Sequence, residues 1–183
     1  MAQTDNSYLA DKVMLRVNHL PERDPITVLD CYAGKGLIWK NIVRLTGRKI
    51  RRLPVDFRDC IGFHLPGNNL AYLTGGMNLD TFDVIDLDAY GIPYLQTKAL
   101  FRRNYRGVVF ATFCQSVMGR PPDQMLLDAG FSQEMIAQIP TIYGKIGWPL
   151  FKQFLASYGI RCIHHRHAER KHYLAFSCAE RCI

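Results

Sequence analysis

The sequence predicts one α/β domain with a mainly parallel sheet, and three patterns within its 183 residues support this fold class. β-Branched runs alternate with segments of helical periodicity, an order that places helices on both faces of a parallel sheet. A loop of small residues joins the first strand to the helix that follows it. The last two apolar runs lie close together in sequence, so they are expected to pair as an antiparallel hairpin.

The first half of the chain supplies a leading helix, two strands and the glycine loop. Apolar residues at helical spacing stop before Pro21, and β-branched residues follow after residue 25. The expected elements are, in order, a helix over 7–20 within a leading segment 1–25, a strand over 26–31, a loop over 33–36, a helix over 37–45, a strand over 52–56 and a turn or strand edge over 69–73.

The second half continues the alternation and then changes direction. Its strands are more apolar than those of the first half, which is typical of strands buried on both faces. The expected elements are a strand over 81–88, a helix over 94–103, a strand over 107–113, helices over 123–138 and 147–158 separated by 140–144, and hairpin strands over 160–163 and 173–177 that flank a polar turn at 164–172.

Composition narrows the surroundings and partners of the chain. A formal charge of +7 and a pI near 9.2 favour an acidic partner such as nucleic acid. No apolar run reaches the roughly 20 residues of a membrane span, and the first residues are polar, so a cytoplasmic protein without membrane contact is expected. The six cysteines form no CxxC pair, which argues against a disulfide scaffold. Zinc is also not expected at Cys162, Cys178 and Cys182 beside the histidine-rich turn, because finger spacing is absent.

The glycine loop excludes two common nucleotide sites. Counting from Gly34, a dinucleotide fingerprint would need a third glycine where this chain has Trp39. A phosphate-binding P-loop would need its lysine after the second glycine, whereas Lys35 stands between Gly34 and Gly36. Both departures favour a ligand that carries no polyphosphate.

Two acidic residues indicate a ligand with cationic and ribose groups. Asp30 ends the first strand, where a carboxylate repels a pyrophosphate but suits an ammonium and a sulfonium, the two cations of S-adenosylmethionine. Asp56 lies 20 residues beyond Gly36 (56 − 36), at the end of the second strand, where it can accept from ribose hydroxyls. The alternative for Asp56 is a loop carboxylate near Arg58.

Two motifs resemble those of class I S-adenosylmethionine-dependent methyltransferases. The first is Val28-Leu-Asp-Cys-Tyr-Ala-Gly-Lys-Gly36. The second, Asp86-Leu-Asp-Ala-Tyr-Gly-Ile-Pro93, is similar to a motif of tRNA guanine-N2 dimethyltransferases and, more loosely, to one of amino-methylating DNA enzymes. The resemblance implies a Rossmann-like seven-stranded sheet with a reversed terminal hairpin. It departs at Ala89, which replaces a proline, and at Asn68, where an aspartate is usual.

The resemblance also implies roles for particular residues. Asp88 and Tyr90 would face the substrate, and the cofactor would be bound by Asp30, Ala33, Gly34, Gly36, Asp56, Asn68 and Asp86. An exocyclic base amine is a weak nucleophile, and Asp88 can accept its hydrogen bond and its proton. Tyr90 offers a face for an unstacked base. The alternatives are that Asp86 bonds loop backbone or anchors the surroundings of Asp88, and that Tyr90 packs against the next helix.

The basic residues divide by their expected edge of the sheet. Clusters at 48–52 and 102–106 precede strands and are interpreted as solvated return loops, whereas Arg120 and the turn 164–172 return to the ligand edge and could follow phosphates. The predicted function is therefore methylation of a base amine in nucleic acid, with tRNA or other RNA favoured over DNA. Alternatives are a cofactor-binding regulatory module and a protein or small-molecule methyltransferase. A further hypothesis is a homodimer or a partner protein that aids substrate recognition.

Overall fold

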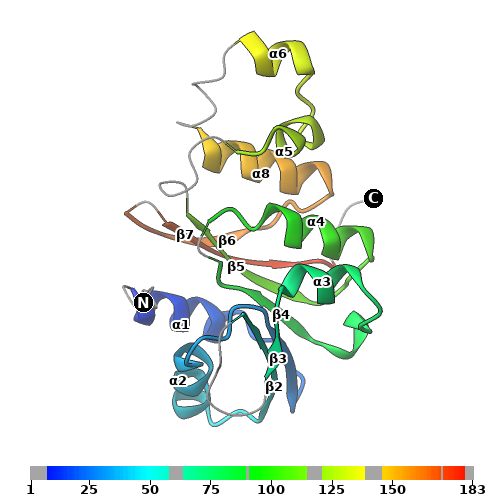
Figure 1. Ribbon diagram of the computed structural model, residues 1–183. Coiled ribbons are helices and arrows are strands. Elements are labelled where there is room, and N and C mark those ends of the chain that lie inside the picture. The colour runs from blue at the N-terminus through cyan, green and yellow to red at the C-terminus, as the bar shows by residue number, and fades with distance from the viewer. Residues whose placement is uncertain are drawn as a thin grey trace.

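The computed structural model describes residues 8–57, 64–89, 91–114, 121–138, 146–169 and 171–179. Seven strands form one sheet in the order β3-β2-β1-β4-β5-β7-β6, with helices on both faces (Figure 1). β1 to β5 run parallel, and β7 lies antiparallel to both β5 and β6. The predicted fold class, a mainly parallel sheet with an antiparallel C-terminal hairpin, is confirmed.

The elements follow the alternating order expected from the sequence. They are α1 (Leu9–Asn18), β1 (Ile26–Asp30), α2 (Leu37–Thr46), β2 (Ile50–Asp56), β3 (Leu65–Pro66), α3 (Asn69–Thr74), a 3₁₀ turn (Leu79–Thr81), β4 (Val84–Leu87), α4 (Tyr94–Arg102), β5 (Val108–Cys114), α5 (Asp123–Asp128), α6 (Gln133–Gln138), α8 (Gly147–Ser157), β6 (His164–Ala168) and β7 (Lys171–Ser177). No described helix is long and apolar enough to cross a membrane.

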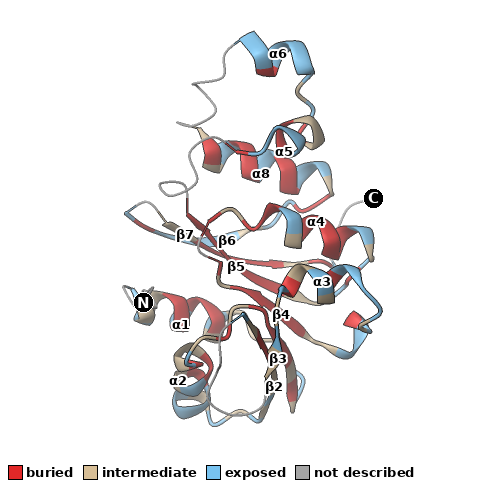
Figure 2. Cartoon of the chain, in the orientation of Figure 1, coloured by how far each residue is buried: buried red, intermediate tan, exposed pale blue. Residues whose placement is uncertain are grey.

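Side-chain alternation along the strands creates two cores, one on each face of the sheet. In β1, Val28 packs in the core beneath α1 and α2, whereas neighbouring Leu29 packs in the core beneath α4, α5 and α8. Figure 2 shows buried residues along the central strands and on the helix sides that face them. Asp30 and Asp86 continue the series that faces α1 and α2, so two carboxylates enter that core where its strands end.

Three local predictions are wrong. The single helix expected over 123–138 is divided into α5 and α6, because Gly130, with a φ of +95°, interrupts the helical backbone. Residues 69–73 were expected to form a turn or strand edge, but they begin α3, because the Asn68 side chain accepts a hydrogen bond from the Leu70 N–H and caps the helix. Residues 160–163 form no strand, because Ile160 is buried just after α8 instead.

The first strand of the hairpin, β6, therefore lies within the stretch predicted to be a polar turn, whereas β7 includes the strand predicted over 173–177. β6 occupies 164–168 and ends the strand order, so it is an edge strand with four of its five residues exposed. Such a strand carries no apolar run that would reveal it in sequence.

Candidate functional site

One pocket lies at the carboxyl edge of the parallel strands, where the ends of β1 and β4 meet the loop that leads into α2. Asp30 is the register partner of Asp86, and Asp88 lies two residues further along the chain. The pocket contains six of the predicted site residues, and its full lining is Leu9, Lys12, Asp30, Tyr32, Ala33, Gly34, Lys35, Gly36, Leu37, Ile38, Trp39, Asp86 and Asp88. The parallel register thus brings together residues that are up to 58 positions apart (88 − 30) in sequence.

The glycine loop is held in a tight turn by the strands on either side. The Gly36 N–H donates to the Ala33 carbonyl at 2.8 Å, and both Gly34 and Gly36 have a positive φ. The Gly34 N–H donates to Asp56 Oδ2 at 2.8 Å. Asp56 therefore lies beside the pocket and shapes the loop, while its role toward a ribose remains a prediction.

A side chain at Gly36 would displace Arg52. The Arg52 guanidinium crosses this glycine at a distance that a Cβ would occupy, and its Nη1 donates to Asp30 Oδ2 at 3.3 Å. Gly47 has nearly the same φ, +67° against +66°, but no atom within 4 Å of its Cβ position. The two glycines thus form a matched pair that differs in surroundings and not in backbone conformation.

We expect Gly36→Ala to lower the free energy of unfolding more than Gly47→Ala. Both variants incur about 1–2 kcal/mol for an alanine in the left-handed region. Only Gly36→Ala also breaks the contact between Arg52 and Asp30. Urea unfolding of both variants measures the difference, and equal losses would show that Arg52 has no structural role at the loop.

Asp86 is the anchor of a buried polar network between the sheet and the helices. Arg16 of α1 donates to both carboxylate oxygens, from Nη2 at 2.6 Å and from Nε at 2.8 Å, and the Trp39 Nε1–H of α2 donates at 2.9 Å. The Arg16 and Asp86 side chains are each 1% exposed. Burial lowers the pKa of Arg16, but the charge of Asp86 outweighs it and holds that pKa above its ordinary value. These contacts match the alternative role of Asp86 as an anchor, and its contact with a cofactor stays a prediction.

Asp88 is held as a carboxylate in the lining of the pocket. Lys12 Nζ donates to its Oδ2 at 2.8 Å, Thr112 Oγ1 donates to its Oδ1, and its side chain is 14% exposed. Burial raises the pKa of Asp88, but Lys12 and then Arg16 outweigh this effect, so the pKa lies below its ordinary value. Asp88 is thus ionised and oriented at neutral pH.

Asp30 has the opposite electrostatic state. Burial, followed by repulsion from Asp86, raises the pKa of Asp30 to about 8, and the contact with Arg52 offsets this only in part. At neutral pH the Asp30 carboxyl is therefore mostly protonated in the free protein. A cation bound in the pocket would favour the ionised form, so its binding would release a proton.

The free energy of unfolding should decrease as the pH rises, because of Asp30. Its folded pKa of about 8 lies above the ordinary value near 4, so the stabilising contribution is complete below about pH 4 and is lost as the pH rises towards 8. Asp30→Asn removes this titration. In urea unfolding, the free energy of unfolding of Asp30→Asn relative to wild type should increase as the pH rises, by at most about 1.4 kcal/mol per pH unit. The exposed Asp80→Asn change serves as control, and parallel pH curves for wild type and Asp30→Asn would contradict the assignment.

Several residues of the site escaped the sequence analysis. Lys12 and Arg16 lie four residues apart on α1, a spacing that puts both on one side of the helix. Thr112 lies in a strand whose sequence pattern is apolar, with no sign of a polar role. Trp39 was used in the sequence analysis only to exclude a dinucleotide-binding motif. Phe57 follows Asp56 directly and is 73% exposed, which offers an apolar face beside the predicted ribose carboxylate.

The remaining predicted residues lie away from the pocket or outside the described residues. Asn68 is exposed and caps α3, so its predicted contact with an adenine is untested. Tyr90 and Arg120 lie outside the described residues. Within the basic stretch 164–172, Arg166 pairs with Asp11 at 3.1 Å and the His164 ring stacks on His19.

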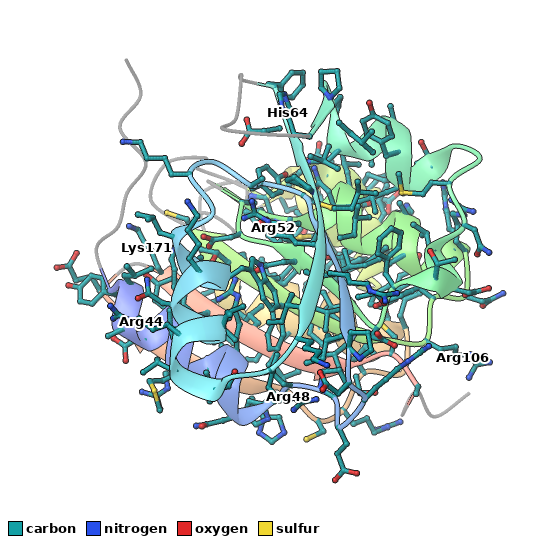
Figure 3. The ribbon with its side chains drawn as sticks, turned by 90° about the horizontal axis from the view of Figure 1, so that it is seen from below. Arg44, Arg48, Arg52, His64, Arg106 and Lys171 are labelled. Carbon is teal, nitrogen blue, oxygen red and sulfur yellow. The ribbon has the colours of Figure 1, made fainter. Side chains whose placement is uncertain are left out.

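The two other basic clusters lie near the amino ends of the strands. Figure 3 shows Arg48 and Arg106 at the end of the sheet opposite to His64. Arg48 donates to three main-chain carbonyls between residues 21 and 23. Residues 50–52 of the first cluster lie within β2 and not in a return loop, and Arg52 reaches Asp30.

Solved structures share this fold. A ribosomal protein L11 methylase from Lactobacillus delbrueckii subsp. bulgaricus aligns over 95% of this chain and 80% of its own, with a TM-score of 0.54 and 17% identity. A candidate ribosomal RNA methyltransferase from Plasmodium falciparum aligns over 95% and 96%, with a TM-score of 0.53 and 14% identity. A protein of Bordetella parapertussis described as a possible exported protein aligns over 93% and 67%, with a TM-score of 0.56 and 11% identity.

These likenesses concern the fold. No protein-family model and no curated protein matches the sequence. The chain has the seven-stranded fold of class I S-adenosylmethionine-dependent methyltransferases, and its pocket lies at the carboxyl edge of the sheet, where open α/β folds bind their ligands.

Proposed function

We propose that this chain is an S-adenosylmethionine-dependent methyltransferase that modifies an exocyclic base amine in nucleic acid, with RNA favoured over DNA. The observation that carries the proposal is the pair of carboxyl groups that the ends of β1 and β4 bring together in one pocket, Asp30 at the glycine loop and Asp88 held by Lys12 and Thr112. Asp30, once ionised, suits a cationic cofactor, and the oriented carboxylate of Asp88 suits an amine that must lose a proton.

The residues of the pocket fit the proposed cofactor. Asp30 can accept from the ammonium of the methionine part, and Lys12 can donate to its carboxylate, because an ammonium has three N–H groups and only one is needed for Asp88. The glycine loop allows close approach of backbone. Asp56 and the exposed ring of Phe57 follow each other at the end of β2, a suitable pair for a ribose and a purine face.

Asp88 gives the site its chemistry toward an amine. S-adenosylmethionine supplies an electrophilic methyl group, whose bond to sulfur breaks as the bond to the amine nitrogen forms. Asp88 would accept a hydrogen bond from the amine, which orients the nitrogen lone pair, and would then take the proton that the methylated amine loses. Lys12 and Thr112 fix the carboxylate orientation that this requires. The proton leaves to solvent through the exposed part of Asp88.

Three features support a nucleic-acid acceptor. The formal charge of +7 favours a polyanion. The motif from Asp86 to Pro93 is similar to that of enzymes that methylate the guanine N2 amine, although Ala89 lacks the fixed φ of their proline. One protein of the same fold is described as a candidate ribosomal RNA methyltransferase.

Two measurements test the proposal. Calorimetric titration with S-adenosylmethionine tests the cofactor, and transfer of a tritiated methyl group to total RNA, DNA and cell protein tests the acceptor. The proposal expects binding together with label in RNA or, less strongly, in DNA. The absence of binding would overturn the cofactor assignment. Binding without transfer to any acceptor would favour a regulatory module, and label confined to protein would replace the acceptor.

A further inference from the structure

A column of stacked rings stands where the C-terminal hairpin meets α8. The Trp148 ring of α8 stacks on His172 of β7, with centroids 4.3 Å apart and planes at 13°. His172 in turn stacks on His167 of β6, at 4.5 Å and 18°. Lys152 Nζ lies 5.5 Å from the centroid of Trp148. The order is therefore ammonium, indole, imidazole, imidazole, with His167 at the outer end.

The column is supported from within and accessible from outside. The buried ring of Phe113 contacts both Trp148 and His172, at centroid distances of 5.7 and 5.9 Å. His167 is exposed, as is His165, which lies 5.3 Å from Trp148. The packing thus fixes the inner rings and leaves the imidazole of His167 towards solvent.

Among the described residues, neither a hydrogen bond to Nδ1 nor a metal-binding group accounts for the position of the His172 ring. His172 Nδ1 is buried and makes no hydrogen bond with any described residue. Burial, followed by the charges of His167 and His165, lowers the pKa of His172 to about 4, so its ring is neutral at physiological pH. No group of three or more His, Cys, Asp or Glu among the described residues is arranged to hold a metal ion. What the rings share is an aligned set of π faces.

The column and the proposed methylation site both use residues near the end of β5. His172 is the register partner of Phe113, and the preceding pair joins Tyr173 to Thr112, which donates to Asp88. Thr112 and Phe113 are successive residues of β5, so their side chains point to opposite faces of the sheet, Phe113 towards α8 and Thr112 towards α1. A strand bound at the column would therefore have to pass over the carboxyl edge of β5 to reach Asp88.

We propose that the column of Trp148, His172 and His167 is a stacking platform for an unpaired base of single-stranded nucleic acid. This inference rests on the proposed nucleic-acid acceptor and adds a site outside the methylation pocket. Aromatic faces accept any base, because every base has a π face, and the nearby cationic Lys152 can offset a backbone phosphate. A peptide added to the β6 edge would use backbone groups and would not need the ring alignment.

The test uses the full chain and short fluorescein-labelled single strands, oligouridylate and oligoadenylate, measured by fluorescence anisotropy at low salt. His167→Ala removes the outer ring and should weaken binding by about 5-fold to 150-fold. His167→Phe keeps a stacking face and should retain most of the affinity. His164→Ala is the matched control, because it removes an exposed imidazole of the same strand that stacks on His19 instead.

Further readouts separate the possible outcomes. A strand of the same length without bases should bind the wild type about as weakly as His167→Ala binds the complete strand. Equal affinity for strands with and without bases, or equal losses in His167→Ala and His164→Ala, would overturn the platform. Failure of the wild type to bind either oligonucleotide would also overturn it. Calorimetric binding of S-adenosylmethionine should be the same in His167→Ala and wild type. A failure of the cofactor assignment is thus distinguishable from a failure of the stacking platform.

Discussion

Replacing Arg16 by methionine is expected to lower the free energy of unfolding by about 3–5 kcal/mol. The variant keeps an unbranched apolar stem but leaves Asp86, which is 1% exposed, without the two guanidinium donors. Among the described residues, Trp39 then remains as the side-chain donor to the buried charge. Urea unfolding followed by circular dichroism measures the loss.

Two further variants decide whether the loss comes from the buried charge. Arg16→Met combined with Asp86→Leu removes both partners and should regain most of the stability, since an apolar pair of similar volume can replace a buried ion pair. Arg44→Met changes an exposed arginine of α2 and should stay within about 0.5 kcal/mol of wild type. An Arg16→Met loss no larger than that of Arg44→Met would contradict the anchoring role of the network.

The acidic side of the pocket could be predicted because the ends of strands can be recognised in the sequence pattern. Asp30 and Asp86 each stand in an apolar β-branched run, and parallel pairing makes them neighbours without further information. The glycine loop could be recognised for a similar reason, because a loop whose backbone approaches a ligand closely requires glycine at a few positions. These predictions needed only local pattern and the parallel direction of the strands.

The basic side of the pocket was not predictable in the same way. Lys12 and Arg16 lie on an amphipathic helix, where charged residues four apart usually mark a solvated face. Whether such residues point to water or to a strand end depends on how the helix is rotated against the sheet. Here both point inward, and the carboxylates of β4 and the residue that follows it compensate their charge. The sequence gives no local sign of this rotation.

The hairpin shows the same limit for strands. Apolar runs marked 160–163 as a strand, yet β6 begins at His164. An edge strand obtains its stability from hydrogen bonds to one neighbour and from side chains on one face, so its composition can be polar. The ring column depends on this displaced register, because β6 must reach His167 for that ring to lie opposite His172. A polar stretch interpreted as a phosphate-binding turn thus becomes a strand with aligned imidazoles.

Replacing Asp88 by asparagine is expected to slow methyl transfer by about 10²-fold to 10⁴-fold while cofactor affinity stays within a few-fold of wild type. The amide preserves the shape of the side chain, because its oxygen can still accept from Lys12 and its N–H can donate to the Thr112 hydroxyl, but it cannot take a proton. Single-turnover transfer of tritiated methyl at saturating cofactor measures the rate, and calorimetry measures affinity. Asp80→Asn, an exposed change outside the pocket, should leave both values unchanged.

The pH profile separates proton transfer by Asp88 from a purely structural role. Lys12 and Arg16 hold the pKa of Asp88 below its ordinary value. The wild-type rate should therefore fall only when the pH drops below about 4, the usual pKa of a carboxyl group. Lys12→Gln removes the larger of these two charges, so the pKa of Asp88 rises and the acid limb of the profile should move to higher pH. An unchanged limb in Lys12→Gln, or full activity in Asp88→Asn, would show that another group accepts the proton. Asp88 would then serve only to orient the amine.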